Sequence, residues 1–136
     1  MTTVKISGSC LCGSVRYEVD EPVAEPKLCH CSRCRKAHGA AFATFSWVGA
    51  EQFRWLAGAD LVSRFESSPQ SWRCFCRACG SQLVWMEGDK LVGVALGTVD
   101  GDPGVRPTAH IFVASKAPWL DITDDLPRFK ELPDRQ

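Results

Sequence analysis

Alternation of apolar and polar side chains predicts β-strands along most of the chain. Residues 15–19 read Val-Arg-Tyr-Glu-Val, in which every second side chain is apolar, and a proline follows at position 22. A period of two residues built from β-branched and aromatic side chains is typical of a strand with one buried face. Six further segments are predicted as strands: residues 42–48, 53–56, 61–65, 82–86, 91–96 and 110–113.

Turn-forming residues separate these segments and leave little room for helix. Glu87-Gly88-Asp89 lies between two predicted strands and reads as a hairpin turn. Residues 97–107 hold three glycines and two prolines and are predicted to be a loop, and one or two helical turns are expected at 32–38. We therefore predict one all-β domain of antiparallel sheets with long loops, spanning residues 1–136, and expect the loops to carry most of the cysteines.

Composition and charge narrow the function classes. The 136 residues suit one domain, and 16 basic residues balance 16 acidic ones to a formal charge of zero. This balance argues against nucleic acid or an anionic membrane as a partner. No apolar run approaches the roughly 20 residues of a membrane span, and the first ten residues lack the apolar core of a signal peptide. We expect a cytoplasmic protein.

The cysteines carry the most specific signal in the sequence. Eight of them fall into three short clusters, and the second and third clusters share the spacing C-x-C-x-x-C. Disulfides belong mainly to oxidising compartments, whereas pairs one or two residues apart bring their sulfurs within reach of one ion. The spacing therefore favours zinc. The clusters are Cys10 and Cys12, then Cys29, Cys31 and Cys34, then Cys74, Cys76 and Cys79.

One closed site follows from the first and third clusters. Cys76 and Cys79 have the spacing of a zinc knuckle, and Gly80 can take the positive φ that closes such a turn. Cys10 and Cys12 lie two residues apart on an extended chain and point to one side. We expect these four thiolates to hold a structural zinc that ties distant segments together, so that its binding energy becomes folding energy.

The second cluster can form an open site. Cys29, Cys31 and Cys34 are close enough to converge on one Zn²⁺, which leaves a net charge of about −1 and a vacant coordination place. Candidates for that place are Cys74, a histidine, water or an external thiol; the histidines are His30, His38 and His110. A lone histidine is more often a hydrogen-bonded structural residue than a ligand. If residues 72–76 are extended, Cys74 faces the saturated site, so we favour an open site and a buried free thiol.

The order of these motifs resembles the glutathione-dependent formaldehyde-activating enzyme family, which also includes centromere protein V. The likeness spans roughly residues 7–133 and includes the ending Ala117-Pro118-Trp119-Leu120 followed by Asp125-Leu126-Pro127. The motifs are Cys10-Leu11-Cys12-Gly13, Cys29-His30-Cys31-Ser32-Arg33-Cys34-Arg35-Lys36 and Phe75-Cys76-Arg77-Ala78-Cys79-Gly80.

The resemblance implies a β-tent fold with two zinc ions of different roles. It implies a catalytic zinc on Cys29, Cys31 and Cys34 whose fourth place receives the thiol of glutathione. Cys74 lies outside the family's ligand pattern, and His38 stands where relatives often have a small residue. The implied structural ligands are Cys10, Cys12, Cys76 and Cys79.

A carbon–sulfur lyase is the function that we favour. A zinc-bound thiol has a lowered pKa, and its sulfur could add to an aldehyde carbon or leave it, as in S-hydroxymethylglutathione. Arg33, Arg35 and Lys36 flank the open site and could pair with the two carboxylates of glutathione, although solvated surface charge is the alternative for each. The expected partners are a small thiol and an aldehyde. The competing hypothesis is a non-enzymatic binding module with two structural zincs.

Overall fold

The computed structural model describes residues 5–133, so the first four and last three residues of the predicted domain lie outside the described part of the chain. The strands are β1 (Lys5–Ser9), β2 (Arg16–Asp20), β3 (Lys27–Cys29), β4 (Ala43–Trp47), β5 (Phe53–Ala57), β6 (Val62–Ser68), β7 (Ser71–Cys76), β8 (Gln82–Glu87), β9 (Lys90–Ala95), β10 (Val99–Asp100) and β11 (Ala109–Ile111). The helix is α1 (Ser32–His38), and the 3-10 turns are Ala50–Gln52, Ala59–Leu61, Leu96–Thr98 and Val113–Ser115.

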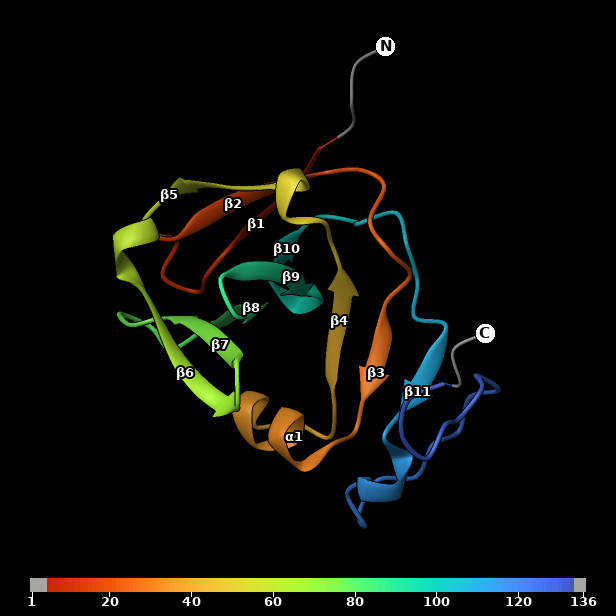
Figure 1. The fold of residues 1–136 in the computed structure, drawn as a ribbon. Coiled ribbons are helices and arrows are strands. Elements are labelled where there is room, and N and C mark those ends of the chain that lie inside the picture. Colours follow the sequence, from red (N-terminus) through yellow and green to blue (C-terminus); the bar gives the residue numbers. More distant parts are fainter. Residues whose placement is uncertain (1–4, 134–136) are drawn as a thin grey trace.

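The strands form two sheets (Figure 1). The smaller sheet has the order β10-β1-β2-β5, and the larger has the order β11-β3-β4-β9-β8-β7-β6. Neighbouring strands pair antiparallel, except β3 and β11, which are parallel. The prediction of an all-β fold of antiparallel sheets is confirmed. No helix in the described range is long and apolar enough to cross a membrane.

Most of the predicted elements are present. Each of the seven predicted strands overlaps an observed one, and the helix occupies the expected residues 32–38. The loop predicted at 97–107 contains the two-residue strand β10, and the predicted hairpin turns at Gly88 and Asp89, with Glu87 still in β8. The expectation that loops carry most of the cysteines is wrong. Half of them lie in strands or the helix: Cys29, Cys34, Cys74 and Cys76.

Two apolar clusters fill the interior. The larger lies between the sheets, where Tyr17 stacks on Phe53 with ring centroids 5.1 Å apart. The Tyr17 hydroxyl lies 2.7 Å from the Thr98 hydroxyl, and burial raises the pKa of this phenol to about 12. The second cluster includes Cys29, Cys34, Ala43, Phe45, Ala95 and Ile111. The second cysteine motif is thus built into an apolar layer rather than displayed on a surface loop.

The C-terminal segment returns alongside β11 (Figure 1). The amide of His110 donates to the carbonyl of Pro127 over 2.9 Å, and the amide of Phe129 donates back to the carbonyl of His110 over 2.9 Å. The amide of Phe112 reaches the carbonyl of Glu131 at 3.0 Å. These bonds continue the edge of the large sheet and bring the tail next to the second cysteine motif.

Candidate metal and thiol site

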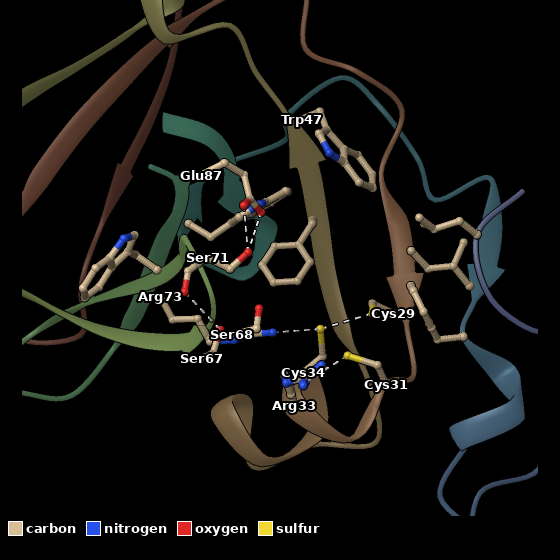
Figure 2. Close-up of a pocket in the computed structure, with 16 residues that line it drawn as sticks. Cys29, Cys31, Arg33, Cys34, Trp47, Ser67, Ser68, Ser71, Arg73 and Glu87 are labelled. Atoms are coloured by element: carbon tan, nitrogen blue, oxygen red, sulfur yellow. Dashed lines mark hydrogen bonds between the residues drawn. The ribbon is translucent and has the colours of Figure 1, made fainter. Parts of the chain in front are cut away.

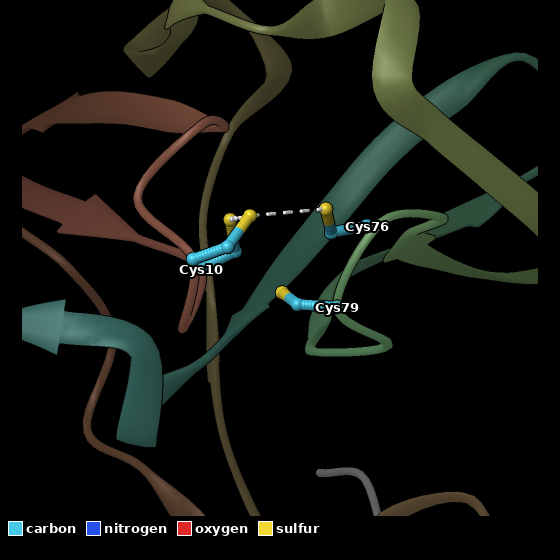
Figure 3. A group of neighbouring side chains, drawn as sticks. Cys10, Cys76 and Cys79 are labelled. Atoms are coloured by element: carbon cyan, nitrogen blue, oxygen red, sulfur yellow. Dashed lines mark hydrogen bonds between the residues drawn. The ribbon is translucent and has the colours of Figure 1, made fainter.

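Four sulfurs from distant segments meet between the two sheets (Figure 3). Cys10 and Cys12 follow β1, Cys76 ends β7, and Cys79 lies in the turn after it. All four Sγ atoms lie within 4.8 Å of one another, with Cys10 to Cys12 at 3.5 Å and Cys12 to Cys76 at 4.0 Å. A tetrahedral zinc with bonds of about 2.3 Å separates its sulfurs by about 3.8 Å. The donor set therefore fits such an ion.

A tight backbone turn closed by a glycine spans each of the two cysteine pairs. Gly80 has φ 83°, and its amide donates to the carbonyl of Cys76 over 2.7 Å. Gly13 has φ 79°, and its amide donates to the carbonyl of Cys10 over 3.0 Å. Side chains strain the backbone in this left-handed region, which explains glycine at both places. Hydrogen bonds from Ser81 lower the pKa of Cys79 to about 5, which favours the thiolate that a metal requires.

The second sulfur group is the trio Cys29, Cys31 and Cys34. Cys29 ends β3, Cys31 precedes α1 as its N-cap, and Cys34 lies in the helix. Their Sγ atoms lie within 4.8 Å of one another, and Cys29 and Cys34 are 3.1 Å apart. This pair would separate by several tenths of an ångström around zinc, since tetrahedral thiolates lie about 3.8 Å apart. The trio otherwise has the number and type of donors of an open zinc site.

Hydrogen bonds within the trio favour a thiolate on Cys31. Bonds from Cys29 and then Cys34 lower the pKa of Cys31 to about 2, and the backbone amide of Cys34 reaches its sulfur at 3.3 Å. The pKa of Cys29 is raised, because its bonds to Cys31 and Cys34 favour its protonated form. The loop between β3 and α1 therefore stabilises negative charge on sulfur before any metal is considered.

Cys74 and His38 lie apart from both sulfur groups. Cys74 is 2% exposed in the larger apolar cluster, where burial raises the pKa of its thiol. Neither residue belongs to the two groups of potential ligands in residues 5–133. The His38 ring packs edge-on against Phe45 with centroids 5.4 Å apart. Both side chains are packed rather than directed at an ion.

His30 and His110 lie in a buried hydrogen-bond chain and not in a sulfur group. Their ring nitrogens Nε2 and Nδ1 are 2.8 Å apart, and Nε2 of His110 lies 2.9 Å from a carboxylate oxygen of Asp124. Burial, and then the charge of His110, lowers the pKa of His30 to about 4. His30 thus faces away from its two cysteine neighbours, as an extended chain predicts.

The trio opens into a cavity of about 260 Å³ (Figure 2). Apolar side chains wall it, among them Phe45, Trp85 and Ile111. At the end away from the sulfurs lie Trp47 and Glu87, whose carboxylate accepts a bond from the Ser71 hydroxyl at 2.7 Å. The cavity therefore joins a floor of sulfurs to a wall that carries both aromatic and polar side chains.

Arg73 is the site residue that sequence reasoning missed. It projects from β7, and its Nη2 lies 3.6 Å from the sulfur of Cys34. Its Nε is buried and has no hydrogen-bond partner within residues 5–133. A signal was present: strand alternation that places Cys74 and Cys76 on one face places Arg73 and Phe75 on the other. The structure brings that opposite face to the trio.

The three cations flanking the motif separate in space. Arg33 lines the cavity of the trio, and Arg33 and Lys36 both line a neighbouring cavity of about 500 Å³. Arg73 also lines both cavities. Arg35 lines neither of these two cavities, and its charge instead acts on His30. Of the predicted carboxylate contacts, Arg33 and Lys36 are therefore the ones placed near a cavity.

Comparisons with known proteins agree with the cysteine arrangement. The family model of the glutathione-dependent formaldehyde-activating enzyme matches residues 5–115. A Halomonas elongata protein named after that family is 30% identical over 86% of this chain and 80% of its own length. A Schizosaccharomyces pombe protein named as an uncharacterized lyase is 33% identical over 57% of this chain and 55% of its own.

A solved structure has a similar fold. A crystal structure of a Rhodobacter sphaeroides protein superposes with a TM-score of 0.59 at 25% identity, covering 74% of this chain and 97% of that one. The family match covers every strand of the described chain and all eight cysteines, including both sulfur groups. This chain belongs to the glutathione-dependent formaldehyde-activating enzyme family.

Proposed function

We propose that the protein is a zinc-dependent carbon–sulfur lyase that forms or cleaves a thiol–aldehyde adduct such as S-hydroxymethylglutathione. Cys29, Cys31 and Cys34 would hold the catalytic zinc, and the thiol of glutathione would take the fourth coordination place. One observation carries the proposal. Three sulfurs converge on the floor of a cavity, and no fourth Cys, His, Asp or Glu ligand joins them within residues 5–133.

Charge compensation distinguishes this site from an ordinary zinc knuckle. Zinc bound by the trio would supply the positive charge that keeps a substrate sulfur ionised at neutral pH. Three thiolates and one divalent ion carry about −1, and a substrate thiolate makes this about −2. Arg73, 3.6 Å from Cys34, offers a cation at that place, and Arg33 lines the same cavity. Arg73 has no carboxylate partner within residues 5–133, so it suits an anionic ligand.

The two cavities suggest how the substrate is divided. The sulfur of glutathione would lie at the trio, with a carboxylate toward Arg33 and Lys36 in the neighbouring cavity. The aldehyde half would lie against Phe45 and Trp85. On cleavage the carbon–sulfur bond breaks, the sulfur keeps the electron pair, the adduct's hydroxyl loses its proton to water and the carbonyl forms. Addition is the reverse.

The other four cysteines would hold a structural zinc. Cys10 and Cys12 follow the first strand of the small sheet, while Cys76 and Cys79 lie at the end of β7 in the large sheet. An ion at this point would link the two sheets that enclose the larger apolar cluster. We assign folding rather than chemistry to this group, because four protein ligands leave no place for a substrate.

Zinc and sulfur counting tests the proposal directly. We expect a three-ligand site to hold zinc more weakly than the closed one and to be partly empty after purification, so the protein is first loaded with zinc. The loaded protein should bind two zincs, and X-ray absorption should give about 3.5 sulfurs per zinc, the mean of four and three. Added glutathione should raise this number to about four and should accelerate exchange between formaldehyde and its glutathione adduct, followed by NMR. Four sulfurs without glutathione, together with no acceleration, would instead support a module with two structural zincs.

A further inference from the structure

A chain of hydrogen bonds joins the C-terminal tail to the trio. A carboxylate oxygen of Asp124 lies 2.9 Å from Nε2 of His110. Nδ1 of His110 lies 2.8 Å from Nε2 of His30, and His30 is the residue between Cys29 and Cys31. Three side chains thus run from an exposed carboxylate to the backbone that holds two of the three sulfurs.

The carboxylate fixes the direction of these bonds. An ionised carboxylate only accepts, so Nε2 of His110 carries the proton that it donates to Asp124. In a neutral ring the other nitrogen is then an acceptor, and His30 must donate its Nε2 proton to His110. Without Asp124, nothing favours the Nε2-protonated tautomer of His110. The direction of the hydrogen bond between His30 and His110 is then no longer fixed.

Backbone bonds bind the same three segments together. The amide of His30 donates to the carbonyl of Ile111 over 3.0 Å, and the amide of Phe129 donates to the carbonyl of His110 over 2.9 Å. The end of β3, the strand β11 and the tail therefore form one bonded layer (Figure 1). The tail also reaches the cavity of the trio, where Leu132 is one of the lining residues.

Burial makes the chain sensitive to the loss of its end. His30 is fully buried and His110 is 2% exposed, so the orientation of the two rings depends on their bonds to each other and to Asp124. Asp124 is 46% exposed at its side chain, so its substitution leaves no internal hole. Its loss should act through the two rings and not through packing.

We propose that Asp124, acting through His110 and His30, positions Cys29 and Cys31 for metal binding, and that the tail is a working part of the site. The family match ends at residue 115, before this tail. The inference rests on the proposed zinc-binding role of the trio. Asp124 and His110 are positioning residues, because they touch neither sulfur nor the cavity floor.

Three variants separate this role from a general effect on folding. Asp124→Ala removes the acceptor, while Asp124→Asn keeps an acceptor oxygen for His110 and for the amide of Leu126, which bonds Asp124 over 2.9 Å. Asp125→Ala changes the adjacent exposed carboxylate and is the matched control. Each protein is loaded with two equivalents of Zn²⁺, and zinc release to a chromogenic chelator is followed over time. The Cys31→Ala protein identifies which phase belongs to the trio.

Asp124→Ala should release the trio's zinc about tenfold faster, the lower end of the range for residues that orient metal ligands. The second zinc should leave at the parental rate, Asp125→Ala should match the parent, and Asp124→Asn should be partly rescued. Equal release from all proteins overturns this inference alone. Faster release of both zincs from Asp124→Ala and Asp124→Asn also overturns it, in favour of general loosening. A parent that still holds only one zinc after loading overturns the proposed function as well.

Discussion

The indole of Trp85 lies across the α-carbon of Gly93 on the neighbouring strand. The two residues are paired in the ladder between β8 and β9, and a Cβ on Gly93 would lie 2.0 Å from Cζ3 of the indole. The same indole meets Phe45 and Trp47, with ring centroids 4.5 and 5.5 Å away. The absence of a side chain at Gly93 therefore allows the Trp85 indole to lie close against β9.

Gly93→Ala should displace this wall. The added methyl group cannot fit under the indole, so Trp85 must move toward the cavity, at a cost of about 1–3 kcal/mol in the free energy of unfolding. Urea unfolding should measure the loss, and the tryptophan emission of the folded protein should shift. Gly97→Ala is the control, since nothing lies within 4 Å of its new Cβ. Equal stability of the two variants would contradict the packing argument.

Local pattern predicted the fold where alternation was strong and missed it where tertiary pairing decides. Residues 15–19 alternate clearly and form β2, whereas β1 reads Lys-Ile-Ser-Gly-Ser and contains few strand-forming side chains. Gly8 in β1 has a specific reason, because the Tyr17 ring occupies the place of its side chain. The short strands β3 and β10 exist through their partners, β4 and β1, and carry no local signal of their own.

Some residues of the candidate site could likewise be predicted from local sequence, and others could not. Cysteine spacing pointed to both sulfur groups, since each group is built from cysteines separated by one or two residues, which are typical metal-ligand spacings. The chain from His30 to Asp124 could not be found so, because parallel pairing of β3 with β11 brings together rings 80 residues apart. Strand alternation could have identified Arg73 in principle, but only the tertiary structure, which brings its side chain within 3.6 Å of Cys34, decides that its face of β7 meets the trio.

Cys76→Ser should prevent stable folding. Cys76 is fully buried in the larger cluster, and its loss leaves three thiolates at the proposed structural zinc. Such an ion contributes about 10–16 kcal/mol in small zinc domains, which is as large as the whole stability of a typical domain, about 5–15 kcal/mol. We expect insoluble protein or a loss of cooperative thermal unfolding, measured by circular dichroism. Cooperative unfolding near the parental midpoint would contradict the assignment.

Cys74→Ala and Cys31→Ala should differ in metal content. Cys74 belongs to neither sulfur group of the described chain, so its variant should keep two zincs and lose only about 1 kcal/mol of packing. Cys31→Ala should keep the fold, because the proposed structural zinc is elsewhere, but should lose one zinc and all glutathione-dependent turnover. Elemental analysis of the two proteins side by side measures this. One missing zinc in Cys74→Ala would mean that this thiol closes the second site.

Arg73→Gln should weaken the thiol site with little effect on stability. The guanidinium lies 3.6 Å from Cys34, and its buried Nε has no partner in the described structure, so the folded state loses little with it. The variant removes the cation nearest to the proposed complex of zinc, three thiolates and a substrate thiolate, which carries a net negative charge. We expect roughly a 10- to 100-fold fall in kcat/KM for adduct exchange, the range for residues that tune metal ligands.

A further substitution separates the contribution of the positive charge of Arg73 to kcat/KM from that of its planar guanidinium. Arg73→Lys keeps the charge but not the planar fork, so it should recover only part of the activity. Arg64→Gln is the matched control, because Arg64 lies on the paired strand with its guanidinium carbon 4.3 Å from the centroid of the Trp72 ring. Its loss should leave kcat/KM unchanged. If both glutamine variants lose activity equally, the effect belongs to the overall charge of these strands and not to a contact with the trio.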